Sequence, residues 1–175
     1  NYELRRNNAP MAPPVVLAGT GGTLNFGLQT LAGIYNVIAT QVSTGCTEVM
    51  NGTVTISINP LPTAMNVTGG DSCCLGCTVI YLGLDSTEPN SNIRYELWLN
   101  GTKYINPLFP PKYGTGAAIQ WGYMTQAGTY TILAVNELTG CQRFMNGSAV
   151  AYFFPVPEGN LTGTDTICAG ESTDL

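Results

Sequence analysis

The sequence predicts an all-β protein made of tandem immunoglobulin-like β-sandwich repeats arranged end to end. Apolar and polar residues alternate with a period of two along much of the chain, and helical periodicity is nearly absent. Glycine, asparagine and proline interrupt these stretches at short intervals, as turns between strands require. The third observation is an internal repeat with a spacing of 95 residues, which indicates several copies of one folded unit.

The repeat relates residues 19–62 to residues 114–157. These stretches are identical at 17 of 44 positions without a gap, and chance would produce only a few identities. They share the motifs Gly-Thr-Gly, Ala-Gly-x-Tyr, Thr-Gly-Cys, Met-Asn-Gly and Pro-x-Pro. Residues before Gly19 resemble the middle of a unit, and residues after Pro157 resemble the opening of one. We therefore predict the C-terminal part of one repeat at 1–62, a complete repeat at 63–157 and the start of a further repeat at 158–175.

Six or seven short strands are predicted in the complete repeat, which fits the size of one immunoglobulin-like sandwich. Six of them lie, in order, at 77–84, 93–99, 103–105, 117–123, 129–136 and 148–154. The second strand alternates clearly, with Tyr95, Leu97 and Leu99 on one face. Asn100 and Gly101 are typical of a two-residue hairpin turn, so the third strand is its return strand. The prolines at 107, 110 and 111 then exclude a central strand and mark a loop.

Each copy places a tyrosine at the start of a strand, in the motif Ala-Gly-x-Tyr. Tyr35 and Tyr130 occupy this position. In Greek-key sandwiches such a tyrosine forms a tyrosine corner, in which the phenol bonds back to the backbone beside the strand. The alternative is a plain buried aromatic residue behind a turn glycine. Both interpretations give these tyrosines a structural role.

Pro-x-Pro motifs close both copies, at 60–62 and 155–157. This motif favours an extended, semi-rigid backbone. We therefore expect stiff joints between successive sandwiches, and a repeated array with such joints would make a rod. The neighbouring repeats of the same polypeptide are then the first partners of each unit.

The six cysteines fit the repeat frame, in which Cys46 corresponds to Cys141 and Cys168 to Cys74. The most economical scheme forms one disulfide per repeat, between the opening cysteine and the cysteine of Thr-Gly-Cys. Only the complete repeat contains both of these cysteines, as Cys74 and Cys141, so we predict a structural disulfide between them. Six cysteines nevertheless allow 15 pairings, and the sequence does not choose among them.

The remaining two cysteines, Cys73 and Cys77, can pair locally across a bend at Gly76. A rival scheme joins Cys46 to Cys73 and so links neighbouring units. A zinc site in this segment would need a second cysteine pair or a histidine, and the chain has no second pair and no histidine. We therefore predict no metal site here.

Charged residues make up only 10% of the chain, and six basic residues face 11 acidic ones, for a net charge of −5. A nucleic-acid-binding protein would need a basic surface, so nucleic acid is excluded as a partner. No apolar run approaches the roughly 20 residues that span a bilayer, so we predict no membrane insertion in this segment. Cysteines at matching repeat positions in a charge-poor, Thr- and Asn-rich chain indicate an oxidising, extracellular setting.

No catalytic or cofactor-binding motif is visible, and we predict that the protein is not an enzyme and needs no cofactor. The acidic residues are scattered, whereas a glycosidase needs two positioned carboxylates. Calcium between units is an alternative use of Asp71, Asp85 and Asp165, but no ordered run of acidic ligands appears. Solvated turns explain these residues better.

The repeat motifs together resemble the repeats of Bacteroidota cell-surface proteins exported by the type IX secretion route, above all the giant gliding-motility adhesins of the SprB kind. The carrying stretches are Tyr-Glu-Leu-Trp-Leu-Asn-Gly at 95–101, Gly-Thr-Gly at 114–116, Ala-Gly-Thr-Tyr-Thr-Ile-Leu-Ala at 127–134, and Thr-Gly-Cys at 139–141. Asp-Thr-Ile-Cys-Ala-Gly at 165–170 also resembles the opening of the PKD-like or Ig-like modules of such proteins. The resemblance covers essentially the whole chain.

The resemblance implies a filamentous adhesin at the cell surface that contacts a surface polysaccharide or a substratum, with this segment in its shaft. It also implies O-glycosylation at Ser86 and Thr166, which stand in Asp-Ser-Thr and Asp-Thr-Ile tripeptides similar to Bacteroidota glycosylation sites. Trp98 is the candidate glycan contact, because its counterpart Arg5 suggests an exposed position. Two alternative functions are a carbohydrate-binding module of a secreted glycan-active protein and a subunit of a self-assembling surface fibre.

Overall fold

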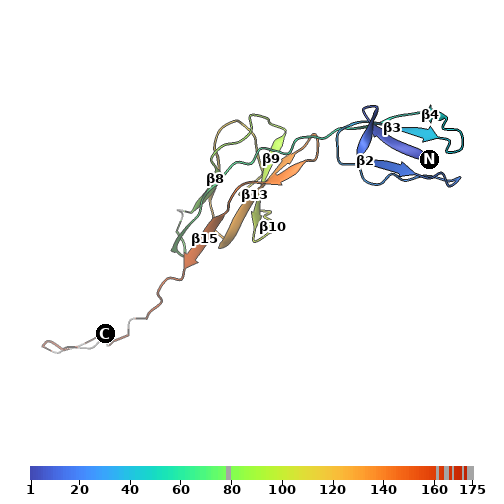
Figure 1. Cartoon of the computed structure of the whole chain (residues 1–175). Helices are drawn as coiled ribbons and strands as arrows, with labels where there is room; N and C mark the ends of the chain where they lie inside the picture. Colours follow the sequence, from blue (N-terminus) through green and yellow to red (C-terminus); the bar gives the residue numbers. More distant parts are fainter. Residues whose placement is uncertain (78–79, 161, 164–165, 167, 171, 173–175) are drawn as a thin grey trace. The chain divides into compact units, whose positions relative to one another are not determined.

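The computed structural model describes the chain except for residues 78–79, 161, 164–165, 167, 171 and 173–175. All regular secondary structure among the described residues is β-strand, which confirms the predicted all-β class. The chain divides into two compact units, Asn1–Pro60 and Leu61–Leu175, called unit 1 and unit 2 below (Figure 1). The division falls inside the predicted Pro-x-Pro joint.

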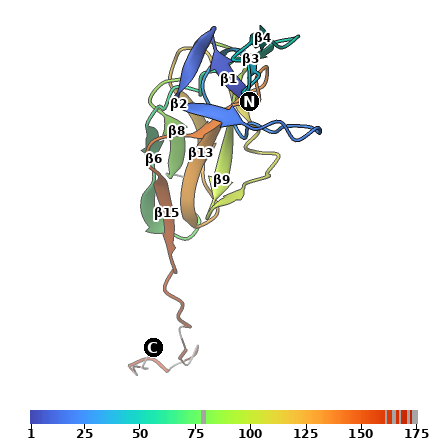
Figure 2. The same ribbon diagram turned by 45° about the vertical axis from the view of Figure 1, so that its right-hand side comes forward.

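Unit 2 is a sandwich of two sheets (Figure 2). Its strands are β6 (Val67–Gly69), β7 (Asp71–Cys74), β8 (Tyr81–Leu84), β9 (Ile93–Leu99), β10 (Thr102–Lys103), β11 (Lys112–Tyr113), β12 (Ile119–Tyr123), β13 (Gly128–Asn136), β14 (Gln142–Phe144) and β15 (Ala149–Phe154). The larger sheet has the order β10-β9-β13-β15-β7, with β11 also on β9 and β14 on β13. The smaller sheet has the order β12-β8-β6.

The core of unit 2 lies between these two sheets. Residues on the inner face of β9 and β13, such as Leu97 and Ile132, pack with Leu82 and Leu84 from β8, and all four are at most 2% exposed. The alternation predicted for β9 is therefore confirmed, since Tyr95, Leu97 and Leu99 all face the core. Burying alternate residues of both sheets between them is the packing of a β-sandwich.

The hairpin between β9 and β10 forms at the predicted residues. Asn100 and Gly101 have φ angles of 49° and 80°, as a two-residue hairpin turn with two left-handed residues requires. Thr102 pairs with Leu99 on the return strand.

Unit 1 is a single sheet with strand pairings that correspond to the larger sheet of unit 2. Its strands are β1 (Tyr2–Arg6), β2 (Ala9–Leu17), β3 (Gly33–Thr40), β4 (Thr47–Val49) and β5 (Val54–Ile56). Strand β3 pairs with β1, β4 and β5, as β13 pairs with β9, β14 and β15. No counterpart of β6, β7 or β8 occurs within 1–60, all of which the structure describes. Only Leu4 and Tyr35 are buried apolar residues in this unit.

The same tyrosine hydrogen bond occurs in both units. The Tyr35 hydroxyl donates to the Leu31 carbonyl, and the Tyr130 hydroxyl donates to the Gln126 carbonyl, each at 2.8 Å. The bond returns to the backbone four residues upstream, which is the geometry of the predicted tyrosine corner. Burial raises the pKa of Tyr130 well above its usual value, so the hydroxyl keeps its proton and remains a donor.

The glycine of the motif is required by close packing. Gly128 has a φ of 145°, and a Cβ there would lie 2.6 Å from Leu99 Cδ1 and 2.9 Å from Asn100 Oδ1. The backbone of β13 therefore passes directly against the β9–β10 hairpin. This contact sets the position from which Tyr130 reaches back to Gln126.

Replacing Tyr130 by phenylalanine should lower the free energy of unfolding of unit 2 by about 1 kcal/mol, because the Gln126 carbonyl loses its buried partner. Urea unfolding followed by tryptophan fluorescence measures this unit alone, since Trp98 and Trp121 both lie in unit 2. Tyr152→Phe is the matched control: Tyr152 is 52% exposed, and its change should stay within about 0.5 kcal/mol. Equal losses in both variants would contradict a special role for Tyr130.

Candidate functional site

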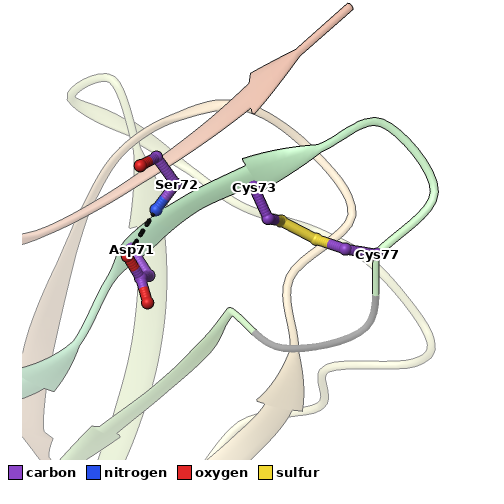
Figure 3. Close-up of a disulfide and its surroundings, with 4 residues drawn as sticks. All are labelled: Asp71, Ser72, Cys73 and Cys77. Atoms are coloured by element: carbon purple, nitrogen blue, oxygen red, sulfur yellow. Dashed lines mark hydrogen bonds between the residues drawn. A yellow bond between two sulfur atoms is a disulfide. The ribbon is translucent and has the colours of Figure 1, made fainter. Parts of the chain in front are cut away.

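A disulfide joins the end of β7 to the following turn. Cys73 and Cys77 are bonded, with their Cα atoms 6.3 Å apart, and the bridge spans the bend after β7 (Figure 3). Gly76 supplies the bend with a φ of 93°, and the Cys77 N–H donates to the Cys74 carbonyl at 3.1 Å. Cys73 and Cys77 also pack against the core of unit 2. The predicted local pairing is therefore confirmed.

The predicted bridge between Cys74 and Cys141 is wrong. Cys74 ends β7 and pairs with Phe154, the last residue of β15. Cys141 instead accepts a hydrogen bond from the N–H of Asn136, the last residue of β13. Strands β13 and β15 are antiparallel and pair only near the start of β13, so the two cysteines lie at opposite ends of the sheet. Their separation is roughly 35 Å at about 3.3 Å per residue, whereas a disulfide needs Cα atoms within about 7 Å.

The position of Cys74 along β7 explains the error. The prediction assumed that a cysteine opening the first strand would meet a cysteine just before the last strand. Strand β7 runs parallel to β15, and Cys74 stands at its end rather than its start. A cysteine at the end of one parallel strand lies beside the end of the other.

Trp98, the candidate glycan contact, lies on the outer face of the larger sheet. It was expected to be exposed, but the structure places it at intermediate burial. Its ring packs edge-on against Phe144, with ring centroids 5.3 Å apart. Its indole N–H is buried without a hydrogen-bond partner among the described residues. Part of the indole is therefore occupied by packing within unit 2.

Further aromatic side chains share this outer face, and the sequence analysis missed them. Phe144, Tyr152 and Phe154 are 49%, 52% and 48% exposed. Tyr152 and Phe154 also meet edge to face, at 4.9 Å. Alternation along β14 and β15 places these residues opposite the buried Ala149 and Ala151, so the pattern was present in the sequence. Trp98–Phe144 and Tyr152–Phe154 are two separate tilted pairs and do not form one flat stacking platform.

Two acidic side chains hold the segment that leads into β6. Asp85 accepts hydrogen bonds from the Asn66 N–H at 2.9 Å and from Asn66 Nδ2 at 2.7 Å. Glu88 accepts a short hydrogen bond from the Thr63 N–H. The bonds from Asn66, those of its side chain first, hold the pKa of the Asp85 carboxyl below its usual value. These acids therefore fix the start of unit 2.

The candidate glycosylation tripeptide at 85–87 is largely built into this structure. Thr87 is only 2% exposed, and its hydroxyl donates to the Ala117 carbonyl at 2.9 Å and accepts from the Thr115 N–H at 3.0 Å. Ser86 is at intermediate burial. The other candidate, Thr166, is exposed, while its neighbours at 165 and 167 lie outside the described residues.

The two described aspartates that were considered as calcium ligands, Asp71 and Asp85, each accept hydrogen bonds from a neighbouring residue. Asp71 accepts a hydrogen bond from the Ser72 N–H at 2.7 Å (Figure 3), Asp85 is bound to Asn66, and Asp165 lies outside the described residues. No group of three or more His, Cys, Asp or Glu side chains suited to a metal occurs in the part of the chain that the structure describes.

One carboxylate is buried on the outer face of the larger sheet. Glu96 is 4% exposed and forms ion pairs with Arg94 and with Lys103, the latter at 2.8 Å. Two basic partners compensate the cost of burying its charge. This group is a structural ion-pair cluster beside Trp98.

No family model matches the chain, and no curated protein is significantly similar to it. A search of the described residues for helices finds none with the length and apolar character needed to cross a bilayer.

Peptide mapping under non-reducing conditions should recover a peptide in which Cys73 and Cys77 are linked, and no peptide linking Cys74 to Cys141. The double variant Cys73→Ala/Cys77→Ala should lower the stability of unit 2 by about 2 kcal/mol, because the short closed loop no longer restricts the unfolded chain. Cys74→Ala is the control, since this cysteine is exposed at the sheet edge. Recovery of a Cys74–Cys141 peptide would contradict the structure.

Replacing Asp85 by asparagine should lower the melting temperature of unit 2 at neutral pH. The folded pKa of Asp85 lies below the unfolded value, so its contribution is complete above about pH 4 and is lost as the pH falls through the folded pKa. The difference between wild type and variant should therefore disappear in acid. Thermal unfolding followed by tryptophan fluorescence measures it, with Glu158→Gln as the control at an exposed carboxylate.

Proposed function

We propose that this chain is a non-enzymatic segment of tandem immunoglobulin-like repeats from the shaft of a long extracellular adhesin at the cell surface. The observation that carries the proposal is the recurrence of one structural unit. The tyrosine bond and the strand pairings around β3 in unit 1 match those around β13 in unit 2, at the spacing of the sequence repeat. A chain that repeats one such unit gains length, and length is what a shaft needs.

The disulfide of unit 2 supports an extracellular setting. A disulfide closes the turn after β7, and disulfides persist mainly in oxidising compartments.

The residues that the two units share in the same roles are structural groups, such as the tyrosine corner and the motif glycine. These groups maintain a sandwich and do not act on a substrate.

The proposed partners are the neighbouring repeats of the same polypeptide and, at the adhesive part of the full protein, a surface polysaccharide or the substratum. The resemblance of the motifs to gliding-motility adhesins supports a role in attachment and movement, after export by the type IX route. A carbohydrate-binding module is the second candidate, favoured by the exposed Phe144 beside Trp98 and by the exposed pair Tyr152 and Phe154 on the same sheet.

Antibodies raised against the purified chain should label intact, non-permeabilised cells of the source organism, because a shaft repeat lies outside the cell. Their monovalent fragments should reduce attachment of the cells to a surface, with fragments against a cytoplasmic protein as the control. Labelling that appears only after permeabilisation would contradict the proposal. Saturable binding of the chain on a glycan array would favour the carbohydrate-binding module instead.

A further inference from the structure

Strand β12 forms an open edge of the smaller sheet in unit 2. It pairs with β8 on one side, and no strand in the described part of the chain pairs with its other side. Both strands lie well inside unit 2. An open edge presents backbone N–H and C=O groups that can bond to a strand of another chain.

Two residues of β12 direct their backbone groups to this open side. The Met124 N–H donates to the Ile80 carbonyl at 2.6 Å, on the side of β8. The Ile119 carbonyl also lies against the backbone of β8. Successive residues of a strand direct their backbone groups to opposite edges, so Gln120 and Tyr123 direct theirs away from β8.

The other outer strands of unit 2 carry features that hinder the addition of a further strand. Strands β10 and β11 contain Lys103 and Lys112, and β7 contains Asp71. Charged side chains on an edge strand oppose pairing with another chain. In β6, the Val67 N–H already donates to the Asn146 carbonyl at 2.9 Å.

Strand β12 has none of these features. It lies in the stretch 113–136, which contains no charged residue and no proline. Beside the edge, Tyr81 and Tyr123 are 47% and 52% exposed, with ring centroids 5.7 Å apart. A β-bulge between Gln120 and Gly122 interrupts the pairing with β8. It explains why two residues three positions apart both face the open side.

We propose that the open edge of β12 is a self-association site, at which β12 of a second copy of this chain adds in the antiparallel direction. A two-fold axis between Trp121 and Gly122 pairs Gln120 with Tyr123 of the second copy, and symmetry generates the reverse pair. Each pair exchanges both of its backbone hydrogen bonds. Such a contact uses the same surface on both copies and closes as a dimer.

The symmetry and the charge of the edge fit a second copy as the occupant. The two-fold axis places the backbone donors of each strand opposite the acceptors of the other. The chain has a net charge of −5, so two copies repel each other, and an uncharged edge is where they approach at the lowest cost. The exposed tyrosines of both copies then lie on one face of the joined sheet, where aromatic side chains stabilise strand pairing.

This inference goes beyond the function proposed above and does not rest on it. Its failure would leave the surface-labelling result unaffected, and the reverse also holds.

Sedimentation velocity of the chain over a wide concentration range tests the proposal. The weight-average mass should rise from that of a monomer toward that of a dimer and no further. Hydrogen exchange of the same samples should slow at the amides of Gln120 and Tyr123 as the concentration rises. The amide of Lys103, in the outer strand β10, is the control and should exchange at the same rate throughout. Non-reducing gel electrophoresis shows whether any association is disulfide-linked.

A point substitution at the open edge sharpens the test. Gln120→Pro removes an N–H that the edge presents and leaves the bonds to β8 in place. Symmetry removes the hydrogen bond twice, so the dissociation constant of the dimer should rise at least about tenfold. Gln120→Ala keeps the N–H and should associate as the wild type does. Tryptophan fluorescence shows that each variant is folded, since Trp121 lies in β12 itself.

Three outcomes would overturn the proposal: a chain that stays monomeric at every concentration, exchange at Gln120 and Tyr123 that does not depend on concentration, or a folded Gln120→Pro variant that associates as strongly as Gln120→Ala. The second outcome would assign any association to another surface. The exchange measurement uses the unaltered chain, so it decides the question even if the proline variant does not fold.

Discussion

Packing of the β12-β8-β6 sheet against the inner face of the larger sheet determines most of the structure of unit 2. It covers Leu97, Tyr130 and Ile132, gives β12 a partner in β8, and brings β7 beside β15. Each strand of this smaller sheet, and β7 beside β15, pairs with a segment distant in sequence, so the packing of unit 2 depends on long-range partners as well as on local propensity.

The tyrosine corner is less dependent on that layer. Both tyrosines are buried and bonded to the same relative carbonyl, although only one of the units has its second sheet. The bond itself is local, since each hydroxyl reaches a carbonyl four residues upstream, and the glycine allows the strand to pass close to the preceding hairpin in both units. The corner, like the pairings of β3 and β13, therefore has the same geometry in both units.

Features of this fold that depend on neighbouring residues are predictable from the sequence, and features that depend on distant strands are not. Period-two alternation predicted β9 and its inner face, and Asn100 with Gly101 predicted the hairpin, because both depend on neighbouring residues. The Cys73–Cys77 bridge was likewise local. The Cys74–Cys141 bridge failed because it depended on where Cys74 stands along a strand that pairs with a distant one, and the sequence alone does not set that register. Trp98 was expected in solvent from its counterpart Arg5, but its burial depends on Phe144 from another strand.

The parallel pairing of β7 with β15 has a mechanical consequence. The chain enters unit 2 beside Asn146, through the bridge to Asn66, and leaves it at the end of β15, beside the end of β7. A pull on the two termini of the unit would draw these neighbouring strands lengthwise past each other. Their hydrogen bonds would then be loaded in shear, all at once, instead of opening one after another as in a zipper. A fold with terminal strands arranged in this way resists stretching at the point where tension enters and leaves it.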